Sequence, residues 1–402
     1  MEVTSNDSKP ADANRREFLK HSAAVSAISY DRIQGANDRI RIAGLGCGGR
    51  CQYLLRTAIE SGGSQLVALA DVYQPRLRMA KKLAGDAAEF ADYRKVLERS
   101  DVDAVVIGSP DHWHVPMTID ALKAGKDVYV EKPVSHTIEE GERLKAAVAG
   151  SKNLVQVGYQ QRSWEHFIEA RKAVQSGRLG KITLVLASWY QVFLAMQKPP
   201  TLDESEIDWK AWLGNAPDRP PDPWRYARWR WYWDYGGGHL TDLYSHWCDT
   251  LHWIFGLDAP LVAQAAGGKY AVDFQDCPDT INCFYEYPGK MSIVYNGTMH
   301  CSLDGGNILM RGDKAMMKLN RDGFAIFPEG VVPTEKTIYP EPALQMRSTR
   351  DGTRDHVANF LDCVRSRKQP NAPVEEAVGA ANACHIGNLA YRRGKRMTFA
   401  EV

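Results

Sequence analysis

The stretch RIRIAGLGCGGR, residues 39–50, and the stretch QLVALAD, residues 65–71, decide the fold of this chain. An apolar strand runs into Gly44-x-Gly46-x-x-Gly49, a helix follows, and a second strand ends on Asp71. We expect Gly44 to make a tight turn, Gly46 to let the backbone approach a pyrophosphate, and Gly49 to let helix and strand pack closely. Free N–H groups at the helix start bind phosphate, and Asp71 can accept both ribose hydroxyls. The order of these features predicts a dinucleotide site.

Strands and helices alternate over the whole segment 37–158, which predicts a doubly wound Rossmann domain. After Gly158 strands dominate, with helices kept apart, which favours a C-terminal α+β domain (159–402) with a large, open, mainly antiparallel sheet. The fold class is therefore α/β followed by α+β. The last part, 355–402, is expected to be a helical tail. The strands expected in the second domain are 182–191, 261–267, 280–287, 291–298, 307–311, 315–319 and 324–327.

Bulk composition excludes several classes of function. The chain has 402 residues and a net charge of +1, so nothing indicates electrostatic binding to nucleic acid or to an anionic membrane surface. No apolar run approaches the roughly 20 residues that span a bilayer. The eight cysteines show no zinc spacing. Pairing among Cys277, Cys283 and Cys301 stays open.

The N-terminal segment, residues 1–36, resembles an export signal. Asn14-Arg15-Arg16-Glu17-Phe18-Leu19-Lys20 is similar to the twin-arginine motif, and a mildly apolar run follows it. Such signals carry folded, cofactor-loaded proteins, so we expect a periplasmic enzyme. The alternative is a polar arm on a cytoplasmic enzyme.

Polar residues follow two of the apolar strands. The strand 127–130 runs into Glu131-Lys132-Pro133, which puts Lys132 where ligands bind in a doubly wound sheet, although a surface lysine after a strand is also common. Pro110 and His114 follow the strand 103–107 and would line the same crevice. Asp111 could be only a helix N-cap.

The expected helix 240–255 carries the second candidate constellation. Asp242, His246 and Asp249 stand at i, i+4 and i+7 and would share one face. A histidine beside a carboxylate is a credible general base near neutral pH, whereas the plain alternative is a solvated helix pair worth about 0.2–0.5 kcal/mol. His239, Asp242, His246, Asp249 and His252 could also ligate zinc or manganese. No metal signature matches, so we expect no metal.

Six tryptophans lie between Trp209 and Trp233. Any one of them is most simply a core residue, but a cluster beside a polar face also suits the apolar faces of sugar rings. Gln160, Gln161 and Arg162 follow the last strand of the first domain and could reach the same cleft.

With these residues assembled, the chain resembles the Gfo/Idh/MocA oxidoreductase family from about Asn37 onward. The resemblance rests on the glycine loop, on Asp71, on Glu131-Lys132-Pro133, and on Gly236-Gly-Gly-x-x-x-Asp242-x-x-x-His246. It implies NAD(P)-dependent redox chemistry on sugars or cyclitols and a homodimer or homotetramer formed through the open sheet. One branch of that family contains NAD-dependent glycosidases, which typically have Tyr-x-x-His-Gly where this chain has Asp242-Leu-Tyr-Ser-His246. We therefore expect a dehydrogenase, with the glycosidase and a metal-assisted keto-sugar lyase or isomerase as alternatives.

The expected mechanism is hydride transfer from a carbinol carbon to NAD. His246 takes the hydroxyl proton, Asp242 orients His246, and Lys132 stabilises the alkoxide. Asp71 favours NAD over NADP, because a carboxylate repels the 2′-phosphate. The residues expected to contact the cofactor are Gly44, Gly46, Cys47, Gly48, Gly49, Arg50, Asp71, Ser109, Pro110, His114, Glu131, Lys132 and Gln160. Those expected to contact a small carbohydrate substrate are Arg162, Tyr190, Trp231, Asp242 and His246.

Overall fold

The computed structural model describes residues 39–193, 198, 200–289, 291–330 and 339–401. The twin-arginine-like segment lies outside the described residues. None of the helices in the described ranges is both long and apolar enough to cross a membrane.

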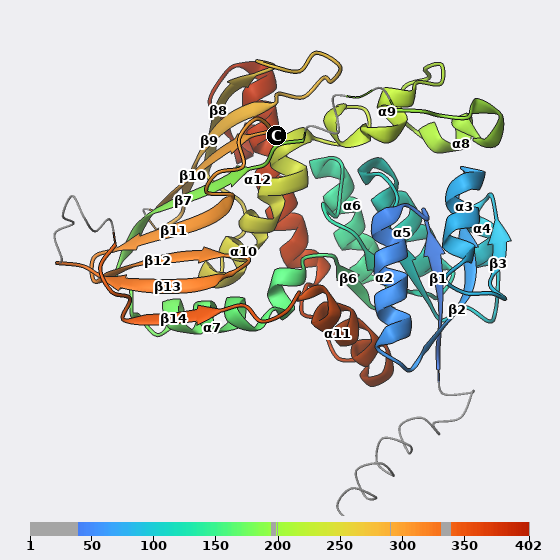
Figure 1. The fold of residues 1–402 in the computed structure, drawn as a ribbon, viewed down its shortest axis with the longest axis horizontal. Helices are drawn as coiled ribbons and strands as arrows, with labels where there is room; N and C mark the ends of the chain where they lie inside the picture. Colours follow the sequence, from blue (N-terminus) through green and yellow to red (C-terminus); the bar gives the residue numbers. More distant parts are fainter. Residues whose placement is uncertain (1–38, 194–197, 199, 290, 331–338, 402) are drawn as a thin grey trace, which may run out of the picture. The chain divides into compact units, whose positions relative to one another are not determined.

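A six-stranded sheet forms the N-terminal domain, with the strand order β3-β2-β1-β4-β5-β6. β1 pairs with β4, β4 with β5, and β5 with β6, all in parallel. Every residue of β4 and β5 is buried, as a parallel sheet covered on both faces requires. Figure 1 shows helices on both sides of this sheet. The strands are β1 (Ile40–Leu45), β2 (Ser64–Ala70), β3 (Ala88–Phe90), β4 (Ala104–Ile107), β5 (Asp127–Val130) and β6 (Val155–Val157), and the helices are α2 (Gly49–Glu60), α3 (Gln74–Lys81), α4 (Tyr93–Leu97), α5 (His114–Lys123) and α6 (Ile138–Ala149).

A nine-stranded sheet forms the C-terminal domain, in the order β14-β13-β12-β11-β7-β10-β9-β8-β15. Its pairs are antiparallel except β7 with β10, so the sheet is mixed and mainly antiparallel, and the predicted fold class is confirmed. Two short strands of this sheet, Leu344–Arg347 and Met397–Thr398, escaped prediction, because two to four residues show no periodicity. The strands are β7 (Ile182–Tyr190), β8 (Val262–Gly268), β9 (Thr280–Tyr287), β10 (Met291–Thr298), β11 (Gly306–Gly312), β12 (Ala315–Asn320), β13 (Gly323–Pro328), β14 (Leu344–Arg347) and β15 (Met397–Thr398).

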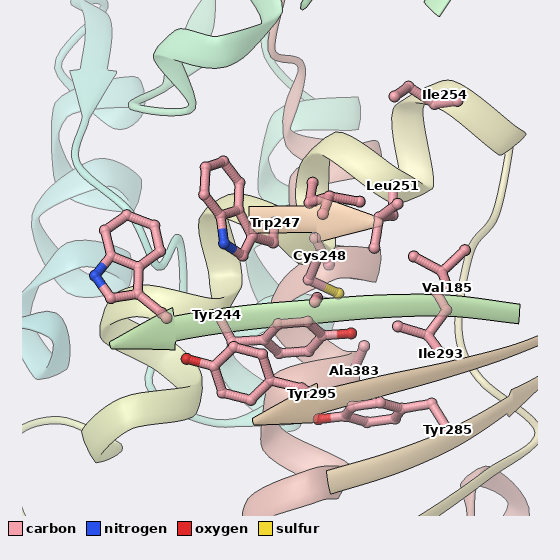
Figure 2. Packing of buried hydrophobic residues seen from close by; sticks show 14 of the residues in the cluster. Val185, Tyr244, Trp247, Cys248, Leu251, Ile254, Tyr285, Ile293, Tyr295 and Ala383 are labelled. Atoms are coloured by element: carbon pink, nitrogen blue, oxygen red, sulfur yellow. The ribbon is translucent and has the colours of Figure 1, made fainter. Parts of the chain in front are cut away.

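Helices cover one face of this sheet. Trp247, Cys248 and Leu251 of α10 (Ser245–Phe255) pack toward Val185 of β7 and Ile293 of β10, as Figure 2 shows. The alternation of buried and half-exposed residues along β10 leaves the opposite face open. The remaining helices of the domain are α7 (Glu165–Gln175), α8 (Trp209–Leu213), α9 (Pro223–Ala227), α11 (Thr353–Ser366) and α12 (Val374–Arg393).

Helix α12 joins the two domains. It contacts α6 of the first domain and α10 of the second, and 14 of its 20 residues are buried. Gly141 of α6 allows this contact, since a Cβ atom there would lie 2.9 Å from Val378. The expected helical tail thus becomes part of the core.

The segment 200–222 contains α8 and leads into α9. It contacts the first domain: Ile207 forms an isolated antiparallel β-bridge with Tyr73, and Glu206 forms an ion pair with Arg78. Figure 1 accordingly shows α8 and α9 beside α3.

Candidate functional site: a dinucleotide cleft and a Lys–Asp–His centre

The glycine loop forms a cradle at the start of α2. Gly46 has φ +75°, and a Cβ atom there would lie 2.7 Å from Ser109 Cα. Gly48 is the N-cap of α2, so the free N–H groups of the first helical turn face out of the loop. Only glycine satisfies both the positive φ and the close approach at position 46.

The other two motif glycines differ from expectation. A Cβ atom on Gly49 would meet nothing within 4 Å, so this residue does not permit the close contact of helix and strand. Gly44 does, because a Cβ atom there would lie 2.7 Å from Leu55 of α2. Gly108 allows a second close approach, 2.7 Å from Cβ of Cys51. The first glycine therefore takes the packing role that the motif usually gives to the third.

Asp71 fixes the backbone of the glycine loop by a hydrogen bond to Cys47. Its two carboxylate oxygens accept the backbone N–H groups of Cys47 (2.7 Å) and Tyr73 (2.8 Å). Burial raises the pKa of Asp71 to about 6, against these two hydrogen bonds and the charge of Arg76, which lower it. The carboxyl group still lines the cleft.

A cleft of about 760 Å³ runs along the glycine loop. Seven of the predicted cofactor residues line it: Gly46, Gly48, Gly49, Arg50, Asp71, Ser109 and Pro110. The opposite wall comes from the α8–α9 segment and was not predicted, because its sequence carries no nucleotide motif; it includes Lys210, Trp212, Tyr226, Trp229 and Arg230. Arg76, which bonds the Tyr226 hydroxyl at 2.8 Å, also lies in this cleft.

The other predicted cofactor residues are not in the lining of this cleft. His114 is buried, with Nδ1 2.7 Å from the carbonyl oxygen of Pro133 and Nε2 3.0 Å from that of Ser109. Glu131 accepts a hydrogen bond from Arg50 at 2.8 Å. Gly44 and Cys47 hold the loop in shape, and Gln160 is buried. These residues support the walls of the cleft.

The Lys132 ammonium group is bound to Asp242, across 110 residues of sequence. Lys132 Nζ donates to the Asp242 carboxylate at 2.8 Å and to its backbone carbonyl at 2.5 Å. Arg230 donates to the same carboxylate oxygen at 3.0 Å. Burial opposes ionisation of Asp242, but these two cations prevail and lower its pKa to about 2. Because Arg230 also lines the dinucleotide cleft, it connects the cleft to this ion pair.

His246 lies beside this ion pair with different partners. Its Nδ1 is 3.3 Å from the side-chain oxygen of Gln161. Its ring stacks on Trp189, with centroids 5.8 Å apart and planes 24° apart. Burial, followed by the charges of Lys132, Arg321 and Arg50, holds the pKa of His246 well below 6.5. The imidazole is therefore neutral at pH 7.

The expected contact between Asp242 and His246 is wrong in this structure. The Asp242 carboxylate bonds Lys132 and Arg230, and His246 bonds Gln161. The cause is local: residues Leu240–Tyr244 form a π-helical turn, so the i, i+4 register of a regular α-helix does not hold across it. Two cations also offer the carboxylate stronger hydrogen bonds than a neutral imidazole does.

Arg162 and Trp231 do not fit the predicted substrate contacts. Arg162 is 2% exposed, donates to Asp249 at 2.7 Å, and also bonds Glu376, so its charge is already matched within the core. Trp231 is likewise 2% exposed and packs against His239. Tyr190 ends β7 and stays half-buried beside Trp189.

The five side chains considered as metal ligands have separate partners. His239 bonds the Tyr295 hydroxyl at 2.7 Å, and His252 bonds that of Tyr287 at 2.7 Å. Within the described ranges, no group of three or more histidine, cysteine or acidic side chains could hold a metal ion. All eight cysteines are unbonded thiols, so the disulfide left open among Cys277, Cys283 and Cys301 does not form.

The chain was compared with known families and structures. Residues 39–159 match the family model described as "Oxidoreductase family, NAD-binding Rossmann fold", and residues 168–402 match its "C-terminal alpha/beta domain". The chain belongs to the Gfo/Idh/MocA oxidoreductase family. The cradle at Gly46, the N-terminus of α2 and the adjacent Asp71 fit a dinucleotide in this domain.

Two curated inositol 2-dehydrogenases match part of the chain. Inositol 2-dehydrogenase 1 of Saccharopolyspora erythraea is 37% identical over 125 residues, which are 31% of this chain and 37% of that protein. Inositol 2-dehydrogenase of Salmonella typhimurium is 29% identical over 181 residues, 43% of this chain and 54% of that protein. The matches thus span about a third to a half of these curated relatives.

Two solved dehydrogenase structures share the fold of this chain. Levoglucosan dehydrogenase in complex with NADH and levoglucosan has a TM-score of 0.70 at 15% identity, over 90% of this chain and 99% of that one. The WlbA dehydrogenase of Bordetella pertussis, in complex with NADH and UDP-GlcNAcA, has a TM-score of 0.68 at 22% identity over the same shares.

Proposed function

We propose that this protein is an NAD-dependent dehydrogenase that oxidises a hydroxyl group of a sugar, glycoside or cyclitol. One observation carries the proposal: a neutral, buried histidine and a carboxylate-bound lysine stand together beside a dinucleotide cleft. The names of the inositol and levoglucosan dehydrogenases support a polyhydroxylated substrate.

His246 acts as the general base. The Gln161 amide oxygen only accepts hydrogen bonds, so Nδ1 of His246 carries the proton in this arrangement. The lone pair of Nε2 then receives the proton of the substrate hydroxyl. NAD supplies the hydride acceptor when it is bound in the cleft.

Lys132 stabilises the developing alkoxide. Its ammonium group has three N–H donors, and two of them are used on Asp242. The third can donate to the substrate oxygen. Asp242 is thus a positioning residue for Lys132, and Arg230 donates to the same oxygen of Asp242.

The test is a cofactor-reduction assay on purified protein with a panel of sugars, cyclitols and glycosides. His246→Ala should lower turnover about 10²–10⁴-fold, the usual worth of a general base, with unchanged NAD affinity. His252→Ala is the matched control, because it removes another buried histidine of α10, one bonded to Tyr287. Near-wild-type turnover of His246→Ala would contradict the proposal. Bond cleavage without net cofactor reduction would indicate a glycosidase instead.

Asp71 supports NAD rather than NADP as the cofactor. A 2′-phosphate would add negative charge beside a carboxyl group that is already buried. Arg76 is the one basic side chain of α3 in the cleft lining, and it already bonds Tyr226. Fluorescence titration with both reduced cofactors tests the preference, and tighter binding of NADPH would overturn it.

The open face of the C-terminal sheet bears on the oligomeric state of the protein. The half-exposed face of the nine-stranded sheet supports a homodimer or homotetramer, which light scattering would test.

Arg15-Arg16 supports twin-arginine export. Replacing both arginines with lysine should keep the protein in the cytoplasm.

A further inference from the structure

Arg321 approaches the candidate site from the β12–β13 side of the C-terminal sheet. It lies in the turn between β12 and β13. Trp189 near the end of β7 pairs with Gly306 of β11, and Ile308 pairs with Leu319 of β12. This register places the turn at the same end of the sheet as Trp189.

The Arg321 guanidinium has no polar partner in the described part of the chain. Its Cζ atom stands 4.7 Å from the ring centroid of Trp189, which stacks in turn on His246. Its Nε–H group is buried without a hydrogen-bond acceptor. A buried donor without a partner costs about 1–3 kcal/mol, and more when it is charged.

The carboxylates around Arg321 are already bonded elsewhere. Asp242 is shared by Lys132 and Arg230. Arg50, whose charge also reaches Arg321, has its own partner in Glu131.

Asp351, whose charge also reaches Arg321, accepts hydrogen bonds from Tyr53 and Thr353. Burial and the charge of Arg50 lower the pKa of Arg321 to about 10, so it is still a cation at pH 7. The surroundings of His246 therefore carry an excess of positive charge.

We propose that Arg321, seated on Trp189, binds the carboxylate of an anionic substrate, so that the substrate is a sugar acid such as a hexuronate rather than a neutral sugar. The planar guanidinium provides paired N–H donors that match a carboxylate. The sugar ring then lies toward His246 and Lys132. This inference rests on the proposed dehydrogenase function and names its substrate class.

The experiment measures binding separately from turnover. The full-length protein with bound NADH is titrated by calorimetry with D-glucuronate, D-galacturonate and D-mannuronate, and with the matched neutral hexoses. The variants are Arg321→Met, Arg321→Lys and the control Arg311→Met, which removes an exposed arginine of β11. At least one hexuronate should bind about 10- to 100-fold more tightly than its hexose, the usual effect of a charged hydrogen bond.

Arg321→Met should abolish this preference, raise KM more than it lowers kcat, and leave NADH affinity unchanged. Arg321→Lys should keep part of the preference, and Arg311→Met all of it. Equal binding of acids and hexoses, no binding of any hexuronate, or a loss confined to NADH affinity would each overturn the inference. Hexuronate binding to the NADH complex, without reduction of NAD in a separate turnover assay, would refute the dehydrogenase function while leaving the carboxylate site standing.

Discussion

Replacing Asp242 with asparagine tests the central ion pair. The Asp242 side chain is 14% exposed, and its pKa falls from 3.8 to about 2 because Lys132 and Arg230 outweigh the effect of burial. At about 1.36 kcal/mol for each tenfold change in acidity, the fall of this pKa from 3.8 to about 2 corresponds to about 2–3 kcal/mol of stability at pH 7. We expect Asp242→Asn to lower the free energy of unfolding by about that amount.

The same pKa fixes the pH window of the effect. The pKa is depressed in the folded protein, so its contribution is complete above about pH 4 and is lost as the pH falls toward about 2. The difference in stability between the wild type and Asp242→Asn should therefore shrink between pH 4 and pH 2.

Double-mutant cycles identify the partner of Asp242. Urea unfolding, followed by the fluorescence of the 11 tryptophans, would be measured for Asp242→Asn, Lys132→Met, His246→Ala and the double variants. We expect a coupling of about 1–3 kcal/mol between Asp242 and Lys132, and a smaller one between Asp242 and His246. A larger coupling with His246 would refute the ion-pair assignment and restore the catalytic dyad that a regular helix predicts.

Two further predictions concern the loops of the first domain. Gly62→Ala should lower the free energy of unfolding by about 1 kcal/mol, because φ is +79° there although a Cβ atom would meet no neighbour. Gly46→Ala should lower it by more, and should weaken NADH binding at least about 10-fold, because its Cβ atom would also meet the Ser109 backbone. Equal thermal unfolding temperatures for the two variants would show that Ser109 moves aside. Asp111 is buried and burial raises its pKa well above 3.8, so the folded state retains its proton and stability falls as the pH rises above about 4. Asp111→Asn should match the wild type near pH 4 and unfold at a higher temperature at pH 8; no difference at pH 8 would show that the carboxyl group is stabilised in its ionised form.

Much of the fold could be predicted from local sequence. The central parallel strands β4 and β5 are short, fully buried runs, and strands of the second sheet such as β10 alternate between buried and half-exposed residues. These periodicities depend only on neighbouring residues. The short strands β3, β14 and β15 and the helix α8 were missed, because their pairing partners rather than their own composition define them.

The candidate site also has one part that the local sequence predicts and another that only the folded chain creates. The glycine loop and Asp71 form one continuous motif, so the sequence by itself determined where a dinucleotide would bind. Which charge pairs with which was decided only by the tertiary structure: Lys132 meets Asp242 across 110 residues, and a π-helical turn separates Asp242 from His246. Arg321 likewise reaches His246 only through the register of β7, β11 and β12. A sequence shows which residues carry charge, but the distances that set the strength of each charge interaction exist only after the chain has folded.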